Sequence, residues 1–168
     1  HNKQQQEGPM IRTAIITLSD KGSKGEREDE SGGTIREMIS SIGADICYYE
    51  VLPDERPLIA VLLARLADSG TIDLIVTTGG TGVSPRDVTP EATREVIDRE
   101  LPGMAEAMRA ASLQKPPHAM LSRAVAGIRK QTLIVNLPGS PRAVRDNLAV
   151  ILPALTHAIE KIKGDPSD

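Results

Sequence analysis

The sequence predicts an α/β fold, a three-layer α/β/α sandwich with a mostly parallel sheet plus an antiparallel hairpin. Strand-like and helix-like segments alternate along the first two thirds of the chain, an order typical of a parallel sheet covered by helices. A first run at residues 11–18 is rich in β-branched residues, as buried strands are. Near the C-terminus two further runs flank Arg129-Lys130-Gln131, and this arrangement predicts the hairpin.

The individual elements follow from apolar patterns and from their boundaries. Strands are expected where short apolar or alternating runs occur, at 11–18, 44–52, 72–76, 124–128 and 132–137. Helices are expected where apolar stripes end at glycine or proline, at 32–41 after a Ser31 cap, 55–69, 90–99, 103–113, 119–123 and 141–162. Pro153 is expected to kink or restart the last helix, because proline lacks the N–H that an interior position needs.

Length and composition limit the class of protein. The 168 residues are expected to form one domain at 10–164, after a disordered leader or cloning remnant at 1–9. A formal net charge of -3 argues against a nucleic-acid partner. No apolar run is long enough to cross a membrane, so we expect no membrane partner and a cytoplasmic location. The three histidines and one cysteine are scattered, which argues against a zinc site.

A glycine-rich segment, residues 77–90, follows the third predicted strand. Gly79, Gly80, Thr81 and Gly82 form a stretch in which the backbone can approach an anion and point N–H groups at it. Asp87 adds a carboxylate just beyond this stretch. The alternative is a turn without a ligand, with Asp87 as a solvated acid. The spacing matches neither GxGxxG nor GxxxxGK[ST], so it indicates neither the usual dinucleotide site nor a Walker ATPase.

Three other polar segments also follow predicted strands: Ser19-Asp20, Pro53-Asp54-Glu55 and the stretch 136–140. In open α/β sheets ligands bind beyond the carboxyl ends of the strands. Each segment has a simpler interpretation, because Ser19-Asp20 could be a turn and Asp54 and Ser140 could be helix caps. Convergence of all four segments on one edge of the sheet favours a binding site there.

These motifs also resemble those of a known family. Together with Leu-Pro-Gly-Met at 101–104, Leu-Ser-Arg-Ala-Val-Ala-Gly at 121–127 and Asn-Leu-Pro-Gly-Ser-Pro at 136–141, they are similar to the MogA/MoaB proteins of molybdenum cofactor biosynthesis. The resemblance covers about residues 10–162 and implies a molybdopterin-binding-like fold and a homotrimer. For catalytic members it implies Mg²⁺-dependent transfer of AMP from ATP to the terminal phosphate of molybdopterin, with release of pyrophosphate. It also implies handover of the product to a molybdate-insertion protein.

The resemblance extends to single residues. Asp54 and Asp87 match the two acids that active members require, and our hypothesis is that they hold Mg²⁺ on the triphosphate. The expected phosphate and nucleotide residues are Gly79, Gly80, Thr81, Gly82, Asn136, Pro138, Gly139 and Ser140. The expected molybdopterin-side residues are Ser19, Asp20 and Ser112.

The expected chemistry needs no side-chain base, because the attacking phosphate is already an anion near neutral pH. The alternative function is a non-catalytic, MoaB-like paralogue that binds molybdopterin or nucleotide, since some relatives depart from the pattern at the first acid. This chain retains Pro53-Asp54-Glu55 and Arg86-Asp87-Val88, which favours catalysis.

Overall fold

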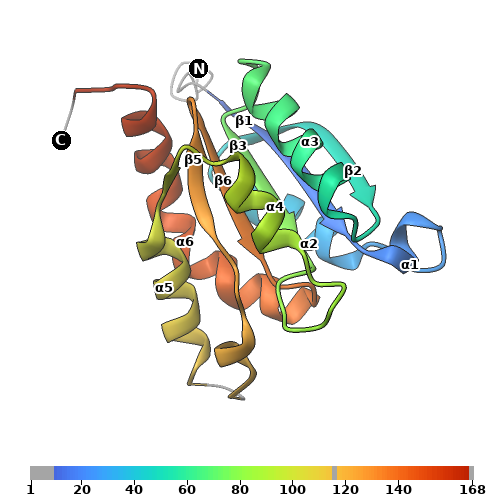
Figure 1. Ribbon diagram of the computed structural model, residues 1–168. Coiled ribbons are helices and arrows are strands. Elements are labelled where there is room, and N and C mark those ends of the chain that lie inside the picture. Colours follow the sequence, from blue (N-terminus) through green and yellow to red (C-terminus); the bar gives the residue numbers. More distant parts are fainter. Residues whose placement is uncertain (1–9, 115–116, 167–168) are drawn as a thin grey trace, which may run out of the picture.

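The structure, a computed structural model, describes residues 10–114 and 117–166, so the expected leader at 1–9 lies outside it. Six strands form one sheet in the order β2-β1-β3-β6-β5-β4 (Figure 1). The strands are β1 (Ile11–Leu18), β2 (Ala44–Leu52), β3 (Leu74–Thr78), β4 (Arg99–Glu100), β5 (Ala126–Arg129) and β6 (Thr132–Leu137). Strands β2, β1, β3 and β6 pair in parallel, and β5 pairs antiparallel with both β6 and β4. The predicted fold class is confirmed.

Helices cover both faces of this sheet (Figure 1). The helices are α1 (Asp20–Ser23), α2 (Glu30–Ser40), α3 (Arg56–Asp68), α4 (Thr89–Val96), α5 (Pro102–Ser112), the 3-10 helix η2 (Pro117–Leu121) and α6 (Pro141–Ile162). Alternate residues of β3 serve the two faces: Leu74 packs with α2, α5 and α6, whereas Ile75 packs with α3 and α4. The core is therefore two aliphatic layers separated by the sheet.

The connections place a crevice between β1 and β3. The chain leaves β1 and returns to the neighbouring β2 through α2, which packs on one face. It then passes from β2 to β3, on the other side of β1, through α3 on the opposite face. Such a reversal of strand order is where ligands bind in open α/β sheets. The carboxyl ends of β1, β3 and β6 meet at this edge.

Three helix starts differ from the prediction, in each case because a polar side chain has another partner. Helix α2 begins at Glu30, since Asp29 accepts a hydrogen bond from the Gly32 N–H and acts as the cap in place of Ser31. The Asp54 side chain does not cap α3, whose N-cap position is Glu55. Thr89 is the first residue of α4, and its hydroxyl donates to the Gly79 carbonyl.

Other differences concern short elements and one proline. Helix α1 and strand β4 were not predicted, because four and two residues are too few to show a period. The expected helical turn at 119–123 lies slightly earlier, as η2. Helix α6 continues through Pro153, so a restart was wrong; its buried stripe, which includes Leu148, Ile151 and Leu155, is continuous across the proline. Within the described residues, no helix combines the length and the apolar character needed to cross a membrane.

Candidate active site

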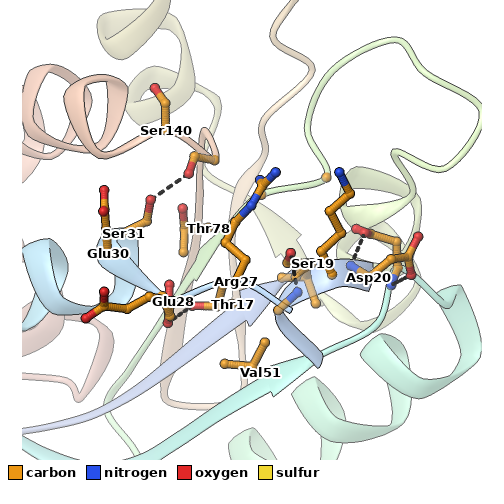
Figure 2. Close-up of a pocket in the computed structure, with 18 of the residues that line it drawn as sticks. Thr17, Ser19, Asp20, Arg27, Glu28, Glu30, Ser31, Val51, Thr78 and Ser140 are labelled. Atoms are coloured by element: carbon orange, nitrogen blue, oxygen red, sulfur yellow. Dashed lines mark hydrogen bonds between the residues drawn. The ribbon is translucent and has the colours of Figure 1, made fainter. Parts of the chain in front are cut away.

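Two cavities open at the carboxyl edge of the sheet. The first, of about 740 Å³, lies beyond β1 and β3 and is bounded by α1 and the start of α2 (Figure 2). The second, of about 620 Å³, is bounded by the glycine loop, α5, η2 and the start of α6. The residues shared by both cavities are Gly80, Asp87, Gly139 and Ser140. The glycine loop therefore forms a wall between two ligand-sized spaces.

The loop adopts its shape because glycine is required at two of its positions. Gly79 and Gly80 have φ values of 98° and 68°, in the left-handed region that favours glycine. A Cβ on Gly79 would lie 2.3 Å from the Leu18 carbonyl oxygen, so only glycine allows the loop to cross the end of β1 this closely.

The N–H groups of the loop are not equivalent. The Gly79 N–H donates to the Leu137 carbonyl at 3.1 Å, so this predicted anion donor is already occupied. In the part of the chain that the structure describes, the N–H groups of Gly80, Thr81 and Gly82 have no acceptor. These three groups can bind an anion placed at the wall between the cavities.

The start of helix α6 lies at the same wall. Ser140 caps this 22-residue helix by accepting from the Ala143 N–H, and the N-terminal end of a long helix favours anions. Two hydroxyl groups hold the preceding turn in place. Ser31 donates to the Gly139 carbonyl and Thr78 donates to the Pro138 carbonyl, both at 2.6 Å. An anion at this wall would therefore lie near both the glycine loop and the start of α6.

Asp54 is the most unusual carboxylate of the first cavity. Its Oδ2 accepts a hydrogen bond of 3.2 Å from the Asp20 N–H, whereas its Oδ1 is buried and has no hydrogen-bond partner among the described residues. Burial raises the pKa of the Asp54 carboxyl, and the negative charge of Asp20 raises this pKa further. A buried carboxylate oxygen without a donor is costly to the fold, and a cation would relieve that cost.

Asp20 positions the backbone of Asp54, and Arg86 in turn binds Asp20. The Asp20 carboxylate accepts a hydrogen bond of 2.9 Å from the Asp54 N–H. It also accepts hydrogen bonds from Nε and Nη2 of Arg86, at 3.1 and 2.8 Å. These hydrogen bonds from Arg86 lower the pKa of the Asp20 carboxyl. Arg86 also contacts Glu55 at 3.2 Å. The sequence prediction did not include Arg86, although its place directly before Asp87 in the Arg-Asp-Val motif was a usable signal.

Asp87 lies on the wall itself. Its Oδ2 accepts a hydrogen bond of 3.0 Å from the Ser84 N–H, and a Cβ on Gly82 would lie only 2.8 Å from this oxygen. Asp54 and Asp87 both line the first cavity. Among the described residues, no three or more His, Cys, Asp or Glu side chains gather as a ready-made metal site. The Asp54 and Asp87 carboxylates at one cavity fit Mg²⁺, because this ion commonly binds one or two carboxylates together with phosphate oxygens of the substrate.

Some of the predicted residues lie apart from the others. Asn136 is fully buried and lines neither cavity: its Oδ1 accepts the Val125 N–H, and its Nδ2 donates to Thr77 and Thr93. Ser112 lines the second cavity, whereas Ser19 and Asp20 line the first. The three residues expected on the molybdopterin side therefore do not share one cavity.

The structure also brings in residues that no motif indicated. Lys21 and Arg27 line the first cavity, and Figure 2 shows the Arg27 side chain crossing it toward the level of Thr78 and Ser140. Within the described chain, neither cation forms an ion pair. His118 lines the second cavity. Lys21 directly follows the Ser19-Asp20 segment, which was a usable signal, but Arg27 sits in a charged loop without any pattern.

Known proteins resemble the chain over nearly all of this fold. A family model described as "Probable molybdopterin binding domain" matches residues 14–157. A molybdopterin adenylyltransferase of Helicobacter pylori is 45% identical over 157 residues, which cover 92% of this chain and 89% of that protein. A molybdopterin adenylyltransferase of Escherichia coli is 42% identical over 140 residues, covering 82% of this chain and 72% of that protein. The crystal structure of the molybdopterin biosynthesis enzyme MoaB from Thermus thermophilus has a TM-score of 0.88 and 51% identity, covering 95% of this chain and 100% of that chain.

Proposed function

The chain belongs to the molybdopterin-binding domain family of the MogA/MoaB proteins, and on that premise we propose that it is a molybdopterin adenylyltransferase. In this reaction an oxygen of the terminal phosphate of molybdopterin forms a bond to the α-phosphorus of ATP. The bond between the α- and β-phosphates breaks, and pyrophosphate leaves. The observation that carries the proposal is the unpartnered Oδ1 of Asp54, which lies in the same cavity as Asp87 and the glycine loop.

The two cavities suit a reaction between two substrates. Each has the size of a small-molecule site, and they meet at the wall formed by Gly80, Asp87, Gly139 and Ser140. One substrate in each cavity would bring its phosphate to this wall, where the free N–H groups of the loop can receive it. Because the attacking phosphate is already ionised, the residues need to position and neutralise rather than to remove a proton.

Asp54 and Asp87 would hold Mg²⁺ in the first cavity, next to the triphosphate. Magnesium, when bound, supplies positive charge to the phosphates of the substrates and to the leaving pyrophosphate. Lys21 and Arg27 add two cations to a cavity whose other charged side chains are acidic. Asp20 and Arg86 keep the Asp54 backbone in place through the hydrogen bonds described above. The proposal thus gives Asp54, Asp87, Lys21 and Arg27 a ligand and gives Asp20 and Arg86 a positioning role.

The proposal includes a homotrimer and transfer of the product to a molybdate-insertion protein. Large exposed apolar side chains support an assembly, because Leu58 and Val61 lie 51% and 64% exposed on α3. Light scattering is expected to give three times the 18.0 kDa mass of the chain. A monomer at micromolar concentration would contradict the trimer. ATP is abundant in the cytoplasm, and we place the reaction there.

A binding-only, MoaB-like paralogue is the second candidate function. The observation that favours it is the 51% identity to a solved protein that carries the MoaB name. In that case the cavities would bind molybdopterin or nucleotide without turnover, and the charge on Asp54 would be dispensable. The two candidates therefore differ in what the Asp54 carboxylate does.

The deciding experiment incubates the protein with Mg²⁺, ATP and purified molybdopterin and detects adenylyl-molybdopterin by chromatography and mass spectrometry. We expect product from the natural sequence. Asp54→Asn is expected to lower turnover by at least about 100-fold while molybdopterin still binds, because the amide keeps the shape but removes the charge. Asp45→Asn, an exposed change on β2, is the matched control and should leave turnover unchanged. Tight molybdopterin binding without product, together with normal binding by Asp54→Asn, would establish the binding-only alternative.

A further inference from the structure

Arg123 fastens the glycine loop at several points. Its Nε donates to the Gly82 carbonyl and its Nη2 donates to the Asp87 carbonyl, both at 2.7 Å. Its backbone N–H donates to the Thr81 carbonyl at 2.8 Å. Its Nη1 donates to the Glu91 carboxylate, on α4, at 2.6 Å. Arg123, which lies in the segment before β5, thus contacts the loop on both sides of its exposed turn. It also contacts the helix that follows the loop, α4.

The two carbonyl contacts have a geometric consequence. Gly82 and Asp87 are the two ends of the exposed turn that carries Val83 and Ser84. A guanidinium group is rigid and planar, so hydrogen bonds from two of its nitrogens fix the two carbonyl oxygens relative to each other. The separation between the phosphate-binding stretch and the Asp87 residue therefore depends on Arg123.

The charge of Arg123 is already used within the protein. Its hydrogen bond lowers the pKa of the Glu91 carboxyl, so Glu91 remains an anion beside it. Nε, Nη1 and Nη2 each have an acceptor on the loop or on α4. Arg123 lines neither cavity. Its position argues against direct contact with a phosphate and for a role through the loop.

We propose that Arg123 is a positioning residue that sets Asp87 at the correct distance from the Gly80–Gly82 N–H groups for adenylyl transfer. The proposal rests on the proposed function for its chemical consequence. The clamp itself, meaning the hydrogen bonds from Arg123 to the carbonyls of Gly82 and Asp87, can be tested without that function. Loss of the clamp should let the turn 82–87 open while the core of the protein stays folded. Asp87 would then occupy its place at the wall for only a fraction of the time.

The test uses the full chain and compares Arg123→Gln and Arg123→Lys with a matched control, Arg129→Gln. Like Arg123, Arg129 binds one carboxylate, that of Asp68, and a main-chain carbonyl, that of Val96, and it lines neither cavity, but its partners lie outside the glycine loop. Hydrogen exchange of peptides that span 79–88 is measured without ligands. We expect these peptides to exchange about tenfold faster in Arg123→Gln, which removes the guanidinium group, and at an unchanged rate in Arg129→Gln.

The second measurement is adenylylation as a function of Mg²⁺ concentration. Arg123→Gln is expected to need about tenfold more Mg²⁺ for half-maximal rate, and Arg129→Gln is expected to match the natural sequence. Arg123→Lys keeps the charge beside Glu91 but cannot bridge two carbonyls, so it should resemble Arg123→Gln. It also replaces that variant if Arg123→Gln does not fold.

The outcomes separate this inference from the proposed function. If the loop peptides of both Arg123 variants exchange like those of Arg129→Gln, the clamp does not exist and the inference is overturned. An unchanged Mg²⁺ requirement in an active Arg123→Gln protein overturns it as well. If the natural sequence makes no product at all, the proposed function fails, and faster exchange in the Arg123 variants alone still supports the clamp on Asp87.

Discussion

Asp54 combines features that a purely structural residue would not have. Folding buries one of its oxygens without a donor and places Asp20 beside it. Because its pKa is raised, the ionised carboxylate is less favourable in the folded than in the unfolded protein, so this group stabilises the fold only below its raised pKa. Such a cost at a cavity wall is typical of a group retained for binding or catalysis. The fold thus holds ready a negative charge that a divalent cation would compensate.

Arg27 lines the first cavity and, among the described residues, forms no ion pair. Arg27→Gln is expected to weaken binding of Mg²⁺-ATP about tenfold, because one charge-assisted contact to a phosphate is worth roughly 1.4 kcal/mol. Isothermal titration calorimetry measures this affinity directly. Lys24→Gln is the matched control, since Lys24 lies in the same loop and does not line the cavity. Equal affinity in the Arg27 and Lys24 variants would show that Arg27 does not contact the nucleotide.

Only some of the site residues could be predicted from the sequence. Gly79 to Gly82, Asp54 and Asp87 were identified because glycine runs and acids after strands are local signals. Arg86 and Arg123 were not, because their partners are distant in the chain, and Arg27 was not, because it lies in a charged loop without any pattern. The cap role expected of Asp54 was wrong for the same reason, since its actual partner is the backbone of Asp20. Spacing along the chain does not reveal such contacts.

At the scale of elements, Asn136 connects β6 to its neighbours. Its side chain accepts from the segment before β5 and donates to hydroxyl groups on β3 and α4, all in the interior. The family motif suggested a nucleotide contact, whereas the structure shows a buried polar junction. The bounds of the strands at 11–18, 44–52 and 132–137 were predicted correctly, whereas β3 and β5 begin two residues later than the apolar runs at 72–76 and 124–128. Which of two polar residues at a strand end faces inward depends on register, which the sequence does not show.

Asn136→Ala should therefore affect stability rather than ligand binding. The change leaves the Val125 N–H and two hydroxyl groups without partners, and we expect a loss of roughly 2–3 kcal/mol in the free energy of unfolding. Urea denaturation measures the loss, and titration with ATP at low temperature should give an affinity within about twofold of the natural sequence. Gln131→Ala, an exposed change in the hairpin turn, serves as the control. An unchanged midpoint with much weaker ATP binding would instead restore Asn136 to the nucleotide site.

At the scale of the whole molecule, the cavities and a buried ion-pair cluster lie at opposite ends of the sheet. The cavities lie at the carboxyl ends of the strands. At the other end, just before β3, Asp73 is almost fully buried. It accepts from the backbone and the guanidinium group of Arg12, and it pairs with Lys163, which follows α6, at 2.8 Å. This cluster ties the first strand to the end of the last helix.

The ionisation of Asp73 is expected to control the stability of the protein in acid, because the ionised carboxylate binds Arg12 and Lys163. Burial alone would raise the pKa of its carboxyl, but hydrogen bonds from Arg12 and Lys163 lower that pKa to about 2. The pKa of an Asp in an unfolded chain is about 3.9, so the stabilisation of about 2.5 kcal/mol is complete above that pH and is lost as the pH falls toward 2. Asp73→Asn should cost about 3 kcal/mol at pH 7 and much less at pH 2.

Thermal and urea unfolding at pH 7, 4 and 2 measure this difference, with Asp45→Asn as an exposed control that should follow the natural sequence at every pH. The same Asp73→Asn protein, assayed well below its unfolding temperature, should retain adenylylation, because the substituted residue lies at the far end of β3 from the cavities. A parallel loss of activity and stability would show that the two ends of the sheet are coupled. Equal destabilisation at pH 7 and pH 2 would show that the Asp73 carboxyl is not ionised in the folded protein.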